Sequence, residues 1–141
     1  MSPAKPLAAS YTSSNQVKLV PGGKPYFEKL EELVDNAKHL IFLQTYIFDE
    51  GITGTSVGAA LSRAAQRGVK VYVLLDGYAS QSLSKEFIQA WRAAGVYFRW
   101  FEPLLRSRRF YVGRRLHHKL VIVPVANIHT THKAVAPVYN D

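Results

Sequence analysis

Cysteine is absent from this 141-residue chain, which excludes disulfide bonds and thiolate-ligated metal sites and suits a reducing compartment such as the cytoplasm. Long hydrophobic runs are missing as well, because no stretch approaches the roughly 18 apolar residues needed to span a bilayer. Residues 1–15 have neither a continuous apolar core nor a basic start, so we expect a flexible lead-in and not a signal peptide. Internal repeats are also lacking. The sequence predicts one domain whose contact with any membrane is peripheral.

What the chain does have is an excess of positive charge, +8 in all, and most of it lies in one short stretch. Residues 24–103 carry nine basic and nine acidic side chains, which cancel. The basic side chains of residues 104–119 have no acidic counterpart there; they are Arg106, Arg108, Arg109, Arg114, Arg115 and Lys119. A basic patch this localised indicates a polyanionic or phosphate-bearing partner. The alternative interpretation is a solvated loop that aids solubility.

Alternating strand and helix patterns fill the chain between its two ends. Strands are predicted at residues 16–23, 40–48, 69–77, 96–103 and 117–123, and helices at 24–39, from Thr53 or Thr55 to Arg67, and from Ser82 or Ser84 to Gly95. Strands 40–48 and 69–77 are apolar, and we expect them to be buried on both faces. Gln44 and Tyr46 share a face with Phe48, and buried packing is their expected role. This alternation predicts an α/β sandwich whose mixed, largely parallel central sheet is flanked by helices.

A candidate phosphate site lies at the start of the last predicted strand, in the sequence RRLHHKLVIV. Alternation along a strand places His117 and Lys119 on one face and His118 on the other. An imidazole can attack phosphorus or shuttle a proton, and an ammonium can neutralise the non-bridging oxygens. Such a triplet is common by chance. The alternative is a solvated histidine at a strand start beside a surface lysine.

Three separate segments extend the pattern beyond this triplet; they are VKLVPGGKPYFEKLEELVDNAKHLIFLQTYIFDE, GVKVYVLLDGYAS and RRLHHKLVIV. In order and spacing they closely resemble the N-terminal half of bacterial cardiolipin synthases, which belong to the phospholipase D superfamily. The resemblance covers residues 17–123. It implies a phospholipase D-like fold and a phosphatidyl transfer that uses neither a metal nor a cofactor.

The signature of that superfamily is His-x-Lys, four residues and then Asp. His117 and Lys119 match its first two members, whereas Pro124 stands where the aspartate belongs. By resemblance, His117 is the nucleophile that forms a phosphohistidine, and Lys119 binds the phosphoryl oxygens. The aspartate, which helps to order the site, is missing. In the family a second copy of the motif, from another domain or subunit, supplies the acid for the leaving group, and this chain contains one copy.

The resemblance ends at Pro124. Residues 124–141 resemble neither the glycine-rich turn nor the following strand of the family, and Asn127, His129 and His132 match none of its motifs. We therefore expect three parts: a flexible segment at 1–15, the first half of a two-domain enzyme at 16–123, and a tail foreign to the family at 124–141. A truncated or frame-shifted coding sequence, or a deliberately shortened chain, is the expected cause.

Three functions follow from the resemblance. The first is a cardiolipin synthase-like phosphatidyltransferase, incomplete or inactive as this chain, that lies in the cytoplasm, peripheral to the inner membrane. It acts on anionic phospholipid, either phosphatidylglycerol or cardiolipin. The residues expected to bind the lipid phosphates are Arg106, Arg108, Arg109, Arg114 and Arg115. The second is a single-motif nuclease that works as a homodimer and contacts nucleic-acid phosphates with the same arginines. The third is an inactive fragment.

Overall fold

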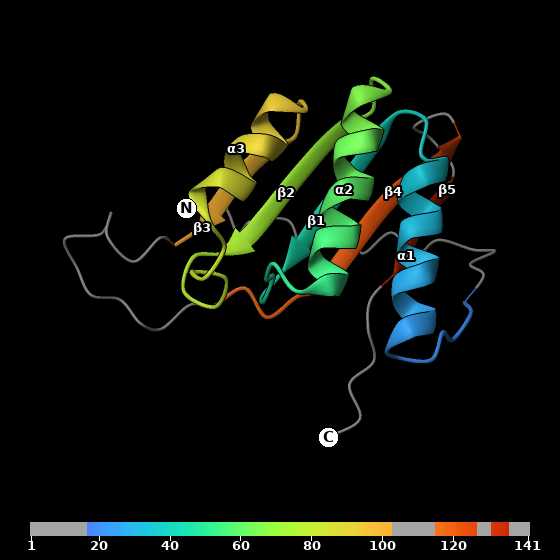
Figure 1. Ribbon diagram of the computed structural model, residues 1–141. Helices are drawn as coiled ribbons and strands as arrows, with labels where there is room; N and C mark the ends of the chain where they lie inside the picture. Colours follow the sequence, from blue (N-terminus) through green and yellow to red (C-terminus); the bar gives the residue numbers. More distant parts are fainter. Residues whose placement is uncertain (1–16, 103–114, 127–130, 136–141) are drawn as a thin grey trace, which may run out of the picture.

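Helices and strands alternate in the computed structural model, which describes residues 17–102, 115–126 and 131–135 (Figure 1). The helices in these residues are α1 (Lys24–Asn36), α2 (Ile52–Gln66) and α3 (Lys85–Ala93). The strands are β1 (Leu40–Thr45), β2 (Lys70–Asp76), β3 (Tyr97–Phe101), β4 (Leu120–Ala126) and β5 (Thr131–Val135).

The strands of the described residues form one five-stranded sheet in the order β3-β2-β1-β4-β5. β1, β2 and β3 are parallel neighbours, whereas β4 runs antiparallel to both β1 and β5. Four strands therefore point in one direction, and β4 points against them. The predicted α/β fold with a mixed, largely parallel sheet is confirmed.

The helices of the described residues lie together on one face of the sheet (Figure 1). α1 contacts β4, α2 contacts β2 and α3 contacts β3, so the three helices cover the sheet from one edge towards the other. The apolar core between the two layers includes Leu30, Val34, Ile41, Leu61, Ala64, Val71, Leu75 and Trp91. Within the described part of the chain, no helix has both the length and the apolar character to cross a bilayer.

The opposite face of the sheet carries a row of aromatic side chains. Tyr72 pairs in register with Phe42 on one side and Tyr97 on the other, and its ring stacks on theirs at centroid distances of 5.1 and 4.9 Å. Phe42 is 44% exposed and Tyr72 is 36% exposed. The prediction that β1 and β2 are buried on both faces is therefore wrong. Aromatic residues make the sequence of a strand look as apolar as that of a fully buried strand. A large ring can nevertheless pack on one side and remain partly exposed to solvent.

Polar and glycine residues end the helices largely where the sequence indicates. Ser84 caps α3, because its hydroxyl accepts a hydrogen bond from a first-turn backbone N–H at 3.1 Å. Gly68 ends α2 with a φ of 90°, a conformation that strains any residue with a Cβ. The N-terminus of α2 differs from the prediction, since Gly51, and neither Thr53 nor Thr55, occupies the N-cap position.

Two predictions at the ends of the domain are wrong. The expected strand at 16–23 is not formed in its described part, because residues 17–20 have no regular structure and Val17 and Leu19 are 86% and 80% exposed. The expectation that no strand follows in 124–141 also fails, since β5 pairs along β4. A sheet edge with unpaired backbone groups readily recruits a neighbouring strand, which accounts for β5.

β4 also runs beyond its predicted end at residue 123 and passes through Pro124. Pro124 lies opposite His132 in the register with β5, and the pairing is irregular between Pro124 and Ala126. Proline lacks an N–H for the sheet ladder and is tolerated in a strand mainly at edges and bulges. The bulge therefore lets β4 accommodate the proline.

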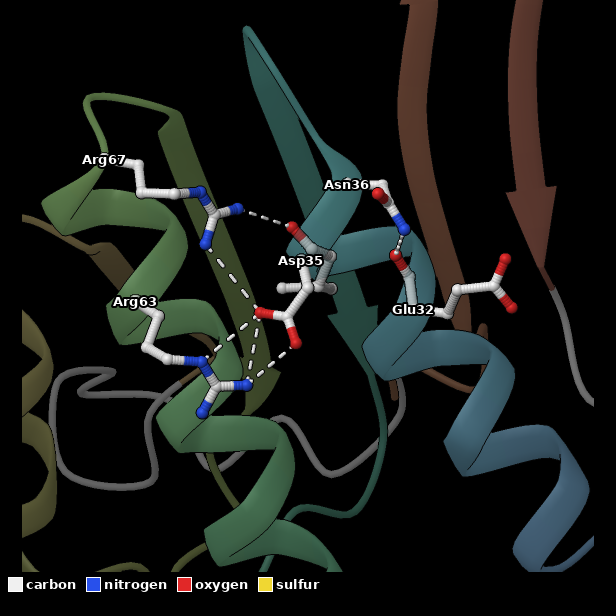
Figure 2. A network of polar contacts seen from close by, with 6 residues as sticks. Glu32, Asp35, Asn36, Arg63 and Arg67 are labelled. Carbon is white, nitrogen blue, oxygen red and sulfur yellow. Dashed lines mark hydrogen bonds and ion pairs between the residues drawn. The ribbon is translucent and has the colours of Figure 1, made fainter.

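Polar contacts join the C-terminal part of α1 to that of α2, as Figure 2 shows. Arg63 donates to both carboxylate oxygens of Asp35, at 3.1 and 2.9 Å, and Arg67 donates to the Val34 carbonyl oxygen at 3.0 Å. The hydrogen bond to Asp35 raises the pKa of the Arg63 guanidinium. These ion pairs are exposed, so each contributes at most about 1 kcal/mol to stability. These ion pairs lie near the N-terminal end of β1, at the opposite end of the strand from its C-terminus.

Candidate active site

The His-x-Lys motif lies at one end of the strands, where the C-terminus of β1 adjoins the N-terminus of β4. Because β4 runs antiparallel to β1, its first residue, Leu120, pairs with Gln44 near the end of β1. The segment 115–119 precedes β4 and carries the motif. In open α/β sheets, ligands bind outside the carboxyl ends of the parallel strands. This edge is therefore the expected place for a site.

Tyr46 contacts both side chains of the motif. Its ring centroid lies 4.8 Å from that of His117, and the Lys119 Nζ lies 5.7 Å from the Tyr46 ring centroid. The Lys119 ammonium also donates to the His117 carbonyl oxygen at 3.4 Å. His117 is exposed, whereas Tyr46 and Lys119 are half-buried. The two motif residues thus both lie against the Tyr46 ring.

The neighbouring His118 contacts Gln44. Its Nδ1 lies 3.4 Å from the Nε2 of Gln44. The sequence predicted buried packing for Gln44 and Tyr46 on a face shared with Phe48, and this is wrong. β1 ends at Thr45, so strand alternation does not extend to Phe48; Phe48 alone enters the core, while Gln44 and Tyr46 are half-buried and face the motif.

Asp76 at the end of β2 holds the segment that carries the motif. Its Oδ2 accepts a hydrogen bond from the Leu116 N–H at 3.1 Å, and its Oδ1 accepts from the N–H groups of Tyr78 and Ala79 at 2.9 and 3.0 Å. Burial acts to raise the pKa of the Asp76 carboxyl, but these three hydrogen bonds and the nearby Arg115 outweigh it, so the net pKa is lowered. The carboxylate therefore stays ionised at neutral pH.

Ser80, four residues further along, holds the opposite wall. Its hydroxyl donates to the Tyr46 carbonyl oxygen at 2.9 Å and accepts from the Phe48 N–H at 2.9 Å. The backbone between Tyr46 and Phe48 is therefore fixed by one side chain from the turn after β2.

Arg115, one of the predicted lipid-binding arginines, contacts Asp76 and Tyr78. Its Nη1 lies 3.7 Å from the Asp76 Oδ1, and its guanidinium lies 4.8 Å from the Tyr78 ring centroid. The side chain is 15% exposed, so it has little surface to offer a lipid. The remaining arginines of that prediction, Arg106, Arg108, Arg109 and Arg114, lie outside the described residues.

A cavity of about 430 Å³ opens beside the motif, between α1, α2 and the adjoining ends of β1 and β4. Lys119 is on its wall, with Gln44, Thr45 and Asp49 as further polar residues. Its apolar lining includes Tyr26, Phe27, Leu30, Leu43, Phe48 and Val57. This volume lies in the range of small-molecule sites, which are mostly apolar with a few polar groups. The mostly apolar lining suits the apolar part of an amphiphile.

The third member of the family signature has no counterpart at its usual position. Pro124 occupies it, within β4, and a proline side chain can neither accept nor donate a hydrogen bond. Among the described residues, no group of three or more His, Cys, Asp or Glu side chains is placed to hold a metal ion. The chemistry that this arrangement offers is a nucleophilic imidazole beside an ammonium that can neutralise phosphoryl oxygens.

Sequence reasoning missed Asp76 and Ser80, and it assigned Tyr46 to the interior. One signal for Asp76 was present, because a carboxylate at the carboxyl end of a parallel strand lies where sites form in open α/β sheets. Ser80 carries no such signal. Its partners are Tyr46 and Phe48, more than thirty residues away, and only the fold brings them together.

An α/β domain that presents a His-x-Lys motif at the carboxyl edge of a mixed sheet has the features of a phospholipase D-like domain. The family model for the cardiolipin synthase, phospholipase D-like domain matches residues 30–131. The chain belongs to this family. It is a cardiolipin synthase-like phospholipase D domain.

Individual relatives agree with this assignment. Cardiolipin synthase B of Escherichia coli K12 is 40% identical over 119 residues, which make up 83% of this chain and 29% of that protein. The major cardiolipin synthase ClsA of Bacillus subtilis is 35% identical over 116 residues, covering 82% of this chain and 24% of that protein. The solved structure of NucT from Helicobacter pylori shares the fold, with a TM-score of 0.50 at 19% identity, over 70% of this chain and 60% of that one. The chain thus spans less than a third of the length of the curated relatives named here.

Proposed function

We propose that this domain supplies one half of a phosphatidyl-transferring active site, with His117 as the nucleophile and Lys119 as the phosphoryl-binding cation. The observation that carries the proposal is the placement of both side chains against Tyr46 at the carboxyl edge of the sheet. The identity to cardiolipin synthases supports the same chemistry.

In the proposed reaction, a nitrogen of His117 attacks the phosphorus of an anionic glycerophospholipid. A P–N bond forms while the P–O bond to the leaving alcohol breaks, and the leaving oxygen takes a proton from a general acid. An acceptor hydroxyl then gives its proton back to the deprotonated general acid, forms a new P–O bond and breaks the P–N bond, which releases the histidine. Lys119 neutralises the non-bridging oxygens throughout.

The general acid of this scheme comes from a second His-x-Lys motif. One chain contains one such motif, so a second copy of the chain or a second domain must supply it. Homodimers with two-fold symmetry bring the same surface of two subunits together, which offers one route. We therefore propose that turnover by the single chain is low.

The cavity beside Lys119 favours a lipid over a nucleic acid. Its lining is mostly apolar, whereas a nucleic-acid site tracks a phosphate backbone with cations and stacking rings. An anionic phospholipid joins a phosphate to an apolar body, which matches Lys119 on an apolar wall. We propose phosphatidylglycerol or cardiolipin as the lipid and a position in the cytoplasm, peripheral to the inner membrane.

Binding to anionic vesicles tests the lipid proposal. Changing Arg106, Arg108 and Arg109 to Ala is expected to weaken adsorption to phosphatidylglycerol vesicles by on the order of 100-fold, because each cation near an anionic surface is worth about 1 kcal/mol. Co-sedimentation at low ionic strength measures the effect, and raising the salt concentration should weaken binding of the unchanged protein.

The matched control is a variant with three exposed lysines outside this stretch, Lys38, Lys70 and Lys85, changed to Ala. It loses the same charge, and we expect it to bind almost as well as the unchanged protein. Equal weakening of both variants would show that diffuse charge alone drives binding. Tighter binding to duplex DNA than to vesicles, lost in the arginine variant, would favour the nuclease alternative.

A further inference from the structure

We propose that Asp76 and Ser80 are positioning residues that together clamp the two facing walls of the site, one wall carrying His117 and the other carrying Tyr46. The consequence for catalysis rests on the proposed function above. The clamp itself is a property of the fold and can be tested without any activity.

Burial is the first argument for the clamp. Within residues 17–102 and 115–124, Asp76 and Ser80 are the only buried polar or charged side chains, and both are fully inaccessible to solvent. Removing a carboxylate or a hydroxyl from water costs free energy unless hydrogen bonds replace the lost ones. No buried side-chain nitrogen or oxygen in this part of the chain lacks a partner, so both side chains are fully satisfied.

The identity of the partners is the second argument. Asp76 accepts from Leu116, the residue that directly precedes His117 and is 40 positions away in the sequence. Ser80 bonds to the backbone of Tyr46 and Phe48, which are 34 and 32 positions away. All three backbone groups lie outside helices and strands, so no ladder hydrogen bond holds them.

A shared turn links the two contacts. The Ser80 N–H donates to the Asp76 carbonyl oxygen at 3.1 Å, and the Asp76 Oδ1 accepts from two further N–H groups of the same turn. The turn is therefore rigid, and it holds the Leu116 segment and the Tyr46 segment at a fixed separation. The contact between the His117 and Tyr46 rings depends on that separation.

Asp76→Asn breaks this arrangement at one hydrogen bond. The single carbonyl oxygen of the asparagine can replace either Oδ1 or Oδ2 as an acceptor. Its NH₂ group then occupies the position of the other oxygen and faces a backbone N–H, which is also a donor. A buried unpaired N–H carries a desolvation penalty. Ser80→Ala is the milder change, because it removes the hydroxyl and leaves the turn backbone unchanged.

Amide hydrogen exchange on the isotope-labelled chain tests the clamp directly. In the unchanged protein, the Leu116 and Phe48 amides are expected to exchange slowly although they belong to no helix or strand. Asp76→Asn should speed exchange at Leu116 by at least about 10-fold, and Ser80→Ala should do so at Phe48, while amides within β2 stay unchanged. Both variants should shift the ring resonances of His117. Asp35→Asn, the same chemical change in the exposed α1–α2 network, should do neither.

Inorganic phosphate supplies the functional readout. Titration should shift the His117 and Lys119 resonances of the unchanged protein, and Asp76→Asn should weaken this binding by about 10-fold, since small misplacements of site groups have large effects. A lack of phosphate response in the unchanged protein would count against the proposed function. The clamp would then be tested by the hydrogen-exchange result alone. Fast exchange of the Leu116 and Phe48 amides in the unchanged protein would overturn the clamp. This outcome needs no variant, so it can be judged even if a variant fails to fold.

Discussion

A second His-x-Lys motif is expected to raise phosphatidyl transfer by this domain by about 10²–10⁴-fold, the usual contribution of a general acid. The motif can be supplied by replacing residues 124–141 with a family-like second half that carries a second His-x-Lys motif. In the proposed mechanism the chain supplies a nucleophile and a phosphate-binding cation from its one motif, and the leaving group takes its proton from the histidine of a second motif. Transfer from labelled phosphatidylglycerol, compared for the two proteins, measures the gain.

Two variants isolate the cause of this gain. Changing the second-motif histidine to Ala in the extended protein should return transfer to the level of the single chain. Pro124→Asp in the single chain should not produce the gain, because it restores an ordering carboxylate and supplies no acid. A single chain that transfers as fast as the extended protein while remaining monomeric in sedimentation analysis would show that the site is complete without a second motif.

The second large effect concerns stability. Trp91→Ala is expected to lower the free energy of unfolding by about 3–5 kcal/mol, the usual cost of removing a large buried aromatic side chain. Trp91 is 2% exposed, its ring lies 5.1 Å from that of Phe48, and its Nε1 donates to the Gly58 carbonyl oxygen at 3.1 Å. The substitution therefore removes both apolar contacts and the donor for a buried carbonyl. A typical domain has only about 5–15 kcal/mol of stability to lose.

Urea denaturation followed by circular dichroism measures this change. Tyr97→Ala is the matched control, because it also removes an aromatic ring, from a side chain that is 59% exposed on the open face of the sheet. Its expected cost is about 0.2–1 kcal/mol, from the lost stacking on Tyr72. Equal losses in the two variants would contradict the placement of Trp91 in the core.

The order of helices and strands could be predicted because local signals carry it. The apolar face of α3, its cap at Ser84 and the glycine that ends α2 all act over a few residues, and the structure has them at the expected places. Exposure could not be predicted in the same way. Phe42 and Tyr72 belong to apolar runs, yet they stack on each other on the face that the described helices leave open.

The candidate site shows the same division. His117 and Lys119 could be found from their motif, which is a local pattern. Tyr46 could not be assigned, since its orientation depends on where β1 ends, and Ser80 could not be found because its partners are distant in the sequence. Sequence patterns therefore predict the reacting groups, whereas the residues that hold them in place emerge from tertiary contacts.

The claim that His117 is the nucleophile of a shared site is tested most directly by trapping the covalent intermediate. The extended two-motif protein is mixed with labelled phosphatidylglycerol, quenched rapidly and analysed by peptide mass spectrometry. We expect a phosphatidyl group on the peptide that contains His117, and its loss together with transfer activity in His117→Ala. A label on the second-motif histidine with none on His117, or undiminished transfer by His117→Ala, would contradict it.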